Sequence, residues 1–210
     1  MKIAIDSPAA AGAGTVAKQI SKYFNLLYLD TGKIYRYIAE IKLNNKKKFS
    51  ISFLNNNIKN LKLSHLQSKK LLSDEIGVVA SEIAKNPKIR KLVHNFQINC
   101  AYKFSNRYNG SCLDGRDITY KIVPDADFKF FITAGVKIRA LRRFKELRKL
   151  GKTVLFKDVL KSIKKRDNSD FNRRISPLKK TKDSILINTT NLSKRACFLK
   201  IKKIIEKNYK

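Results

Sequence analysis

Small residues fill positions 7 to 15, between a short apolar run and a helical pattern. The segment reads Ser7-Pro8-Ala9-Ala10-Ala11-Gly12-Ala13-Gly14-Thr15. Backbone N–H groups can surround a phosphate only where no bulky side chain holds the chain away, and the positive end of the following helix dipole favours an anion. The composition therefore indicates a phosphate-binding loop, with an ordinary strand-to-helix turn as the alternative.

The loop departs from the usual phosphate-binding pattern, G-x-x-x-x-G-K-[ST], at its charged position. Ala13 stands where that pattern has lysine, and Ser7 stands where it has the first glycine. Thr15 keeps a hydroxyl that could bind a magnesium ion bridging two phosphates, with helix capping as the alternative. The nearest lysine is Lys18, which we expect to point away from the loop along the helix.

Two further segments place charged side chains just after predicted strands. Residues 30–32 are Asp-Thr-Gly, and Arg36 follows one turn into a helix, where it could fork onto a phosphate or a carboxylate. A surface arginine is the alternative. Residues 114–117 are Asp-Gly-Arg-Asp. Because glycine lets the chain turn sharply off a buried strand, Arg116 is either exposed at a ligand-binding edge or part of a structural ion pair.

Arginines also gather near the end of the chain. Arg139, Arg142 and Arg143 share one helix face because their spacing is i, i+3 and i+4. Residues 166–173 alternate in charge with few apolar anchors, which we interpret as a mobile cover. A lid of arginines suits phosphoryl transfer, since that reaction needs mostly positioning and neutralisation of negative charge. A solvated basic helix is the alternative.

The elements that must position these residues alternate along the chain. Hydrophobic periodicity predicts strands at 2–5, 26–29, 111–113, 128–133 and 185–187. It predicts helices at 14–24, 33–43, 73–85, 87–104, 136–150 and 155–166, and a last helix that starts at Ser193. Between them, residues 44–60 are polar with one short apolar piece. Strands that alternate with helices favour an α/β fold with a parallel sheet covered on both faces, and ligands bind such sheets at the carboxyl ends of the strands.

Positive charge dominates the composition. The 210 residues include 47 Lys+Arg against 16 Asp+Glu, which gives a formal net charge of +31. This balance favours polyanionic ligands, namely nucleotides, nucleic acid or an anionic membrane surface. Solvated lysine-rich faces are the alternative explanation for any single lysine run. The hydrophobic content of 43% predicts a folded globular protein.

The cysteines and histidines give no sign of a metal or disulfide framework. Cys100, Cys112 and Cys197 lie far apart without C-x-x-C spacing, so we expect them to be small buried residues in a reducing cytoplasm. His65 and His94 have no carboxylate or cysteine at ligand spacing. No stretch approaches the roughly 20 apolar residues of a membrane span, and no secretory signal is expected.

Taken together, these motifs resemble those of the bacterial cytidylate kinases, P-loop enzymes that phosphorylate CMP and dCMP with ATP. The resemblance covers nearly the whole chain. It is carried by Ile5-Asp6 with Gly12 and Gly14-Thr15, Leu29-Asp30-Thr31-Gly32 with Ile34-Tyr35-Arg36, Asp114-Gly115-Arg116-Asp117 with Pro124-Asp125-Ala126, Arg142-Arg143, and Arg166-Asp167 through Asp170 and Asn172-Arg173 to Pro177-Leu178. The D-G-R-D and R-D-x-x-D-x-N-R motifs, in this order, are specific among nucleoside monophosphate kinases.

The resemblance implies a fold and a set of site residues. The fold would be a three-layer α/β/α P-loop NTPase-type domain over residues 1–210, with a five-stranded parallel sheet, a small helical NMP-binding insertion at 44–108 and an arginine-rich lid at 142–175. The phosphates of ATP would bind the loop 7–15, with Mg²⁺ at Thr15. CMP or dCMP would bind Thr31, Arg36, Arg116, Asp117, Asp170 and Arg173. The catalytic groups that reach the phosphates would be Arg166, Arg142 and Arg143.

One departure from the family bears on catalysis. The family loop reads G-P-[SA]-x-x-G-K-G-T, and this chain departs from it at Ser7, Ala10 and Ala13. Loss of one transition-state donor costs about 2.7 to 4 kcal/mol, and we expect the lid arginines and the overall positive charge to compensate for the missing lysine.

The main hypothesis is a monomeric, cytoplasmic, ATP-dependent (d)CMP kinase of pyrimidine metabolism, without a membrane partner. The alternative is a catalytically impaired kinase-fold protein that binds nucleotides or nucleic acid through its basic surface.

Overall fold

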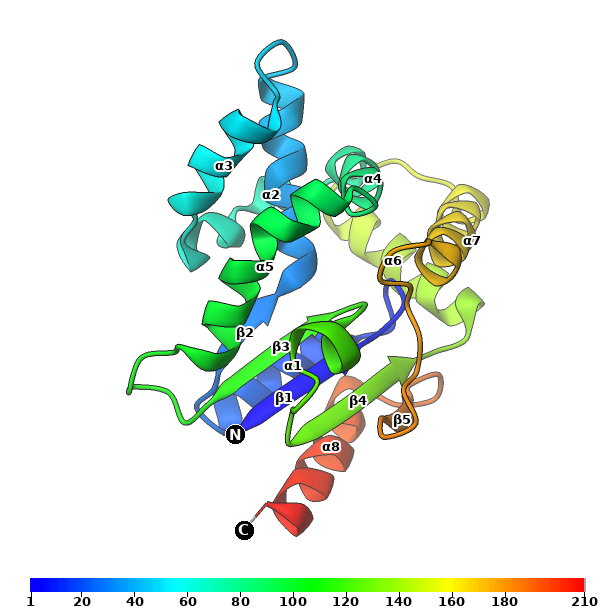
Figure 1. Cartoon of the computed structure of the whole chain (residues 1–210). Coiled ribbons are helices and arrows are strands. Elements are labelled where there is room, and N and C mark those ends of the chain that lie inside the picture. Colours follow the sequence, from blue (N-terminus) through cyan, green and yellow to red (C-terminus); the bar gives the residue numbers. More distant parts are fainter. Residues whose placement is uncertain (210) are drawn as a thin grey trace.

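Five parallel strands form one sheet in the order β2-β3-β1-β4-β5 (Figure 1). The structure is a computed structural model that describes residues 1–209, apart from the side chain of residue 74. The strands are β1 (Lys2–Asp6), β2 (Leu27–Asp30), β3 (Ser111–Gly115), β4 (Phe128–Thr133) and β5 (Ile185–Asn188). Because every neighbouring pair is parallel, their carboxyl ends meet at one edge. The predicted α/β fold with five strands is confirmed.

Helices connect the strands and cover both faces of the sheet (Figure 1). They are α1 (Ala13–Tyr23), α2 (Thr31–Asn44), α3 (Ile51–Lys59), α4 (Asp74–Ile83), α5 (Pro87–Tyr102), α6 (Val136–Lys149), α7 (Phe156–Asn172) and α8 (Lys194–Asn208), with short turns η1 (Leu63–Gln67), η2 (Lys69–Leu72) and η3 (Ile118–Ile122). Several helices begin at a polar cap whose side chain accepts a first-turn N–H: Ser50, Ser73, Asn86 and Ser193. The predicted starts at Ser73 and Ser193 therefore have a physical cause.

The alternation of side chains along the strands divides the core into two layers. Ile3 and Ile5 of β1 pack with α1 and α8, whereas Ala4 between them packs with α2, α3 and α5. Cys112 and Leu113 of β3 divide between the two faces in the same way. The sheet is thus buried on both sides, which confirms the predicted three-layer arrangement.

A third, smaller apolar cluster joins α6 to α7. Ala140 and Leu147 of α6 pack with Val159 and Ile163 of α7, and Ala9 from the loop after β1 belongs to the same cluster. The two helices lie side by side next to the carboxyl ends of the strands (Figure 1). This cluster fixes the arginine-bearing helices against the predicted phosphate-binding loop.

Two segments differ from the sequence prediction. Residues 44–60 are predicted as a polar connection, yet they include α3, which buries Leu54 and Ile58. The helix predicted at 155–166 is longer than expected, because α7 continues through Asn172 into the segment interpreted as a mobile cover. The buried Asp170 explains this difference, since it pairs with Arg116 and so ties the charged segment to the rest of the domain.

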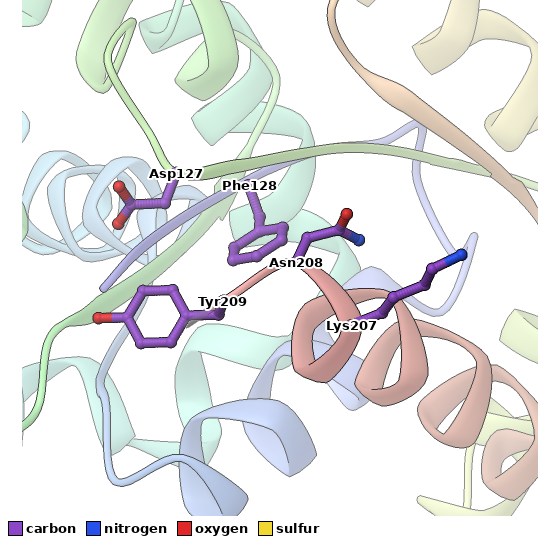
Figure 2. A pocket seen from close by; sticks show the side chains of 5 residues that line it. All are labelled: Asp127, Phe128, Lys207, Asn208 and Tyr209. Atoms are coloured by element: carbon purple, nitrogen blue, oxygen red, sulfur yellow. The ribbon is translucent and has the colours of Figure 1, made fainter.

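Residues 207–209 lie at the amino end of the sheet, beside Asp127 and Phe128 (Figure 2). The ring of Tyr209 lies 6.2 Å from that of Phe128, at the start of β4. Asp127, Lys207 and Asn208 line the same hollow. This contact anchors the end of α8 at the edge of the sheet opposite to the carboxyl ends of the strands.

Two expectations from the composition are also answered. Cys100, Cys112 and Cys197 are all buried free thiols, as predicted. Within residues 1–209, no helix has both the length and the apolar character that crossing a membrane requires.

Candidate active site

A cavity of about 1080 Å³ opens at the carboxyl ends of the strands, where the sequence predicts the ligand. Its walls come from the loop after β1, the end of β3, and parts of α1, α2, α4, α6 and α7. The loop residues that line it are Ser7, Pro8, Ala9, Ala10, Gly12, Ala13, Gly14 and Thr15. Of the loop residues, Ala11 is outside the lining, and its carbonyl group accepts a hydrogen bond from Arg142.

The loop has an unusual backbone at two positions. Gly12, the N-cap of α1, has φ +93°, which glycine adopts without penalty. Ala10 has φ +58°, in the left-handed region that costs a residue with a β-carbon about 1 to 2 kcal/mol. Ser7 has no positive φ, and its N–H donates to the carbonyl of Gly115 at 3.1 Å. Serine is therefore accommodated at position 7, whereas Ala10 is strained.

Two arginines of α6 hold carbonyl groups of the loop. The Nη1 atom of Arg139 donates to Ala9 O at 3.1 Å. The Nη1 atom of Arg142 donates to Ala11 O at 3.3 Å, and its Nη2 atom donates to the carbonyl of Thr189 at 2.6 Å. Because a trans peptide points its C=O and N–H in opposite directions, bound carbonyls on the outer side leave the next N–H groups facing the cavity. The loop is thus braced in the form that a phosphate cradle needs.

Arginines from four separate elements line the cavity. They are Arg36 of α2, Arg116 after β3, Arg143 of α6 and Arg166 of α7. The predicted convergence of arginines from distant segments is therefore observed for these four. Arg142, predicted as a catalytic group, lies outside the lining because its guanidinium braces the loop and Thr189.

A single carboxylate organises three of the arginines on this side of the site. The Nε atom of Arg116 donates to Asp170 Oδ2 at 2.7 Å, and Arg166 and Arg173 lie 4.0 and 3.8 Å from the same carboxylate. Although burial opposes it, the charges of Arg116 and Arg166 hold the pKa of Asp170 below its usual value. Asp170 is therefore ionised and sets the orientation of Arg116.

Positive charge in the cavity exceeds what this carboxylate neutralises. The Nε atom of Arg166 is buried and has no hydrogen-bond partner in the described part of the chain. Burial, and then the charges of Arg116, Arg36 and Arg143, lower the pKa of Arg166 to about 10. An anion placed between these guanidinium groups would relieve their mutual repulsion and satisfy the open donor.

Arg36 reaches the cavity across helix α4. Its Nη1 atom donates to the carbonyls of Leu71 and Ser73, at 2.7 and 2.9 Å. A β-carbon at Gly77 would lie 2.9 Å from Nη2 of Arg36, so the guanidinium lies directly over the glycine. Glycine in the middle of a helix is unfavourable, and here the close approach of Arg36 accounts for it.

Four predicted nucleotide-binding residues are outside the cavity lining, namely Asp170, described above, and Thr31, Asp117 and Arg173. The buried hydroxyl of Thr31 donates to the carbonyl of Asp114 at 2.8 Å. Asp117 forms a buried ion pair with Arg90 of α5, a partner that the sequence alone did not indicate. The Nε atom of Arg173 donates to the carbonyl of Ser176 at 2.6 Å. In this conformation these groups contact protein atoms, next to the residues that face the cavity.

Side-chain oxygen atoms also line the cavity, from Thr15 near the start of α1 and from the ends of β2 and β3. Thr15 is exposed there, and Gly12 rather than Thr15 is the N-cap, which contradicts the capping alternative. Asp30 and Asp114 line the same cavity. Burial, together with the charge of Asp30, raises the pKa of Asp114 well above its usual range, while a 3.0 Å hydrogen bond from the Tyr28 hydroxyl opposes this rise. A bound cation would keep both carboxylates ionised.

The expectation for Lys18 is wrong. This residue lines the cavity together with Ala13, Gly14 and Thr15 instead of pointing away from the loop. Side chains on an α-helix lean toward the N-terminus of the helix, so a lysine one turn into α1 extends back toward the loop. Because of this tilt, a side chain five residues after Ala13 still extends toward the cavity.

The sheet order, the small-residue loop before α1 and the arginines across the cavity define an α/β phosphate-binding protein of the P-loop kind. The chain belongs to the cytidylate kinase family, whose family model, described as cytidylate kinase, matches residues 3–207. The resemblance found in the sequence is therefore confirmed at the level of the family.

Curated relatives support the same assignment. A cytidylate kinase of Clostridium botulinum (strain Okra / Type B1) is 38% identical over 216 aligned positions that cover 99% of both chains. A cytidylate kinase of Bartonella tribocorum is 40% identical over 93% of this chain and 90% of the relative. Among solved structures, an uncharacterized protein from Eubacterium ventriosum shares the fold, with a TM-score of 0.57, 16% identity and 97% coverage of each chain.

Proposed function

We propose that this chain transfers the γ-phosphoryl group of ATP to CMP or dCMP, giving ADP and CDP or dCDP. Membership of the cytidylate kinase family supports this function. The main structural support is the set of four arginines that line one cavity. One of them, Arg166, has a buried Nε atom without a hydrogen-bond partner among the described residues. Such a surplus of positive charge opposite a phosphate-binding loop suits two phosphate-bearing substrates.

The two substrates would occupy different walls of the cavity. The loop 7–15 and the N-terminus of α1 would hold the phosphates of ATP through backbone N–H groups. Arg36 and Arg116 would hold the phosphate of CMP, with Asp170 orienting Arg116 as it does here. Thr31, Asp117 and Arg173, which the family resemblance assigns to the nucleotide, would support the wall behind that phosphate.

The catalytic step requires little from the protein beyond position and charge. An oxygen of the CMP phosphate attacks the γ-phosphorus of ATP, a new P–O bond forms, and the bond to the β-phosphate bridging oxygen breaks, so that ADP leaves. The attacking oxygen is already anionic at neutral pH, so no general base is needed. Arg143 and Arg166 would neutralise the charge on the equatorial oxygens in the transition state.

Magnesium would accompany ATP, and the residues at the loop suit it. Mg²⁺ prefers oxygen ligands and commonly binds one or two carboxylates together with substrate phosphates. Thr15, Asp30 and Asp114 supply a hydroxyl and two carboxylates to the lining of the cavity. When bound, the ion would add positive charge at the phosphates and would favour the ionised form of the buried Asp114, against the burial that raises its pKa.

The proposed insertion and lid both contribute to the cavity. From residues 44–108 come Leu72, Gly77, Val78, Ser81 and Glu82. From residues 142–175 come Arg143, Arg166 and further residues of α6, of α7 and of the connection between them, such as Thr153 and Ser169. The two segments also touch each other, because Nη2 of Arg143 donates to the carbonyl of Leu72 at 3.2 Å. We propose that both close further over the substrates.

The test is an assay of purified protein with ATP, magnesium and each of CMP, dCMP, UMP and AMP. We expect ADP production that depends on CMP or dCMP, with CDP or dCDP as the second product, and weaker turnover of UMP and AMP. Absence of any CDP, together with a salt-dependent shift of single-stranded RNA in a gel, would instead support the alternative of a nucleic-acid-binding protein.

A further inference from the structure

We propose that the ammonium group of Lys18 contacts the substrate phosphates and replaces the lysine that the loop lacks at position 13. This inference rests on the proposed phosphoryl transfer and concerns the source of its missing positive charge. The loop has Ala13 where the family pattern has lysine, and Ala13 is buried with 4% of its surface exposed. A cation that acts on the same phosphates must therefore come from elsewhere in the cavity.

The position of Lys18 on α1 brings its side chain to the loop. Gly14 and Lys18 are one turn apart and share a face of the helix. A β-carbon at Gly14 would lie 3.4 Å from both Asp114 Oδ2 and the Tyr28 hydroxyl, so this face points to the carboxyl ends of β2 and β3. Because helical side chains lean toward the N-terminus, the four-carbon stem of Lys18 extends toward Gly14 and Thr15. Its place in the cavity lining agrees with this direction.

The ammonium group of Lys18 is free to bind a ligand. In the part of the chain that the structure describes, Lys18 has no ion pair or hydrogen bond, and its contact is with the ring of Tyr28, whose centroid lies 6.0 Å from Nζ. Its charge also acts on Asp114, whose pKa it lowers against the effect of burial. This exposed ammonium, whose charge reaches Asp114, has three N–H donors for phosphate oxygens.

The remaining lysines of the cavity are placed less well for this role. Lys33 lies on α2 and Lys165 on α7, so neither belongs to the helix that begins at the loop. Lys22 lies one turn beyond Lys18 on the same face of α1, is exposed and is outside the cavity lining. Lys22 is therefore a matched control: it has the same side chain on the same helix and is also exposed, but it does not line the cavity.

The experiment compares Lys18→Met, Lys18→Arg and Lys22→Met, each alone and combined with Ala13→Lys. We expect Lys18→Met to lower kcat about a hundredfold, as removal of one transition-state donor does, while Lys18→Arg keeps part of the activity and Lys22→Met keeps all of it. Ala13→Lys should restore the activity of Lys18→Met, so that the two substitutions are strongly non-additive.

A binding measurement separates this inference from the proposed function. Calorimetry with magnesium and a non-hydrolysable ATP analogue should show weaker binding to Lys18→Met than to the natural protein, and unchanged binding to Lys22→Met, whether or not CMP is turned over. Absence of CMP turnover by both the natural protein and Ala13→Lys would overturn the proposed function. Equal kcat and equal analogue affinity for Lys18→Met and the natural protein would overturn the role of Lys18, as would a loss of activity that Ala13→Lys leaves unrestored.

Discussion

Arg139 and Asp167 form a two-pronged ion pair between α6 and α7. Nη1 of Arg139 donates to Oδ1 of Asp167 at 3.0 Å, and Nη2 donates to Oδ2 at 2.5 Å. The same guanidinium donates to the carbonyls of Ala9 and Ala134. One buried side chain therefore fixes the phosphate-binding loop, the end of β4 and the lid helix to one another.

Removing the charge of Asp167 tests this connection. In Asp167→Asn the shape is kept, but the guanidinium of Arg139, whose side chain is 6% exposed, loses its counter-charge. Breaking a buried pair on one side costs about 3 to 5 kcal/mol, so we expect a loss of about 3 kcal/mol in the free energy of unfolding, because Asp167 is less buried than its partner. Urea unfolding measures it. Asp158→Asn, on the same helix, is the control, and equal stability of the two variants would contradict the prediction.

The strain at Ala10 predicts a stabilising substitution. Ala10 has φ +58°, and glycine adopts this conformation without the clash of a β-carbon. Ala10→Gly should raise the free energy of unfolding by up to about 1 kcal/mol, because relief of the strain exceeds the added entropy of the unfolded chain. Ala9→Gly is the matched control, since Ala9 has an ordinary backbone and packs in the α6–α7 cluster, and it should destabilise the fold. A loss of stability in Ala10→Gly would show that the loop is not strained.

A substitution at Gly77 should weaken CMP binding without lowering the stability of the fold. In Gly77→Ala the new β-carbon would come within 2.9 Å of Nη2 of Arg36. The tip of a long side chain can shift at little cost, and alanine is the better helix former by about 1 kcal/mol, so the fold should be at least as stable. The displaced guanidinium should raise KM for CMP severalfold with a smaller change in KM for ATP. Steady-state kinetics and thermal unfolding measure both effects, and an unchanged KM for CMP would exclude Arg36 from the acceptor site.

The strands and the loop could be predicted from the sequence because their signals are local. Each strand is a short apolar run bounded by polar or turn residues, and the loop is recognised by its small residues. Helix α3 was missed because it lies in an asparagine- and lysine-rich segment and buries only Leu54 and Ile58 along its length. Its start is set by Ser50, a cap that a serine in such a segment does not reveal by itself.

The sequence predicted which residue types form the site. The role of each residue depends on contacts that only the three-dimensional structure shows. Arg142 and Arg143 are neighbours in sequence, yet one braces Ala11 and the other lines the cavity. Arg90 was not predicted, because its partner Asp117 lies on a different element and nothing in the sequence joins them. Spacing along a helix shows which side chains share a face, but the atoms that they meet are set by the packing of that helix.

Asp6, at the end of β1, is buried with its carboxylate facing a row of donors. It accepts hydrogen bonds from the N–H of Ile118 at 2.8 Å, the N–H of Thr119 at 3.0 Å and the hydroxyl of Thr119 at 2.6 Å. These contacts hold the start of η3 against the end of β1. Burial nevertheless outweighs them and raises the pKa of Asp6 to about 6.

This raised pKa predicts how stability depends on pH. Between its ordinary pKa and about 6, Asp6 is protonated in the folded chain but ionised in the unfolded one, so its contribution to stability is greatest at low pH and is lost as the pH rises through about 6. Asp6→Asn cannot titrate, and it should be less stable than the natural protein throughout, because its amide group faces backbone donors. The natural protein should therefore exceed Asp6→Asn in free energy of unfolding by more at acidic pH than at slightly alkaline pH. Since one pKa unit is worth about 1.4 kcal/mol, this difference between the two proteins should change by a few kcal/mol across the range. Urea unfolding of both proteins across this range measures the advantage, in which the titrations of all other groups cancel. An advantage that grows with rising pH would show that the hydrogen bonds outweigh burial and that the pKa of Asp6 is lowered.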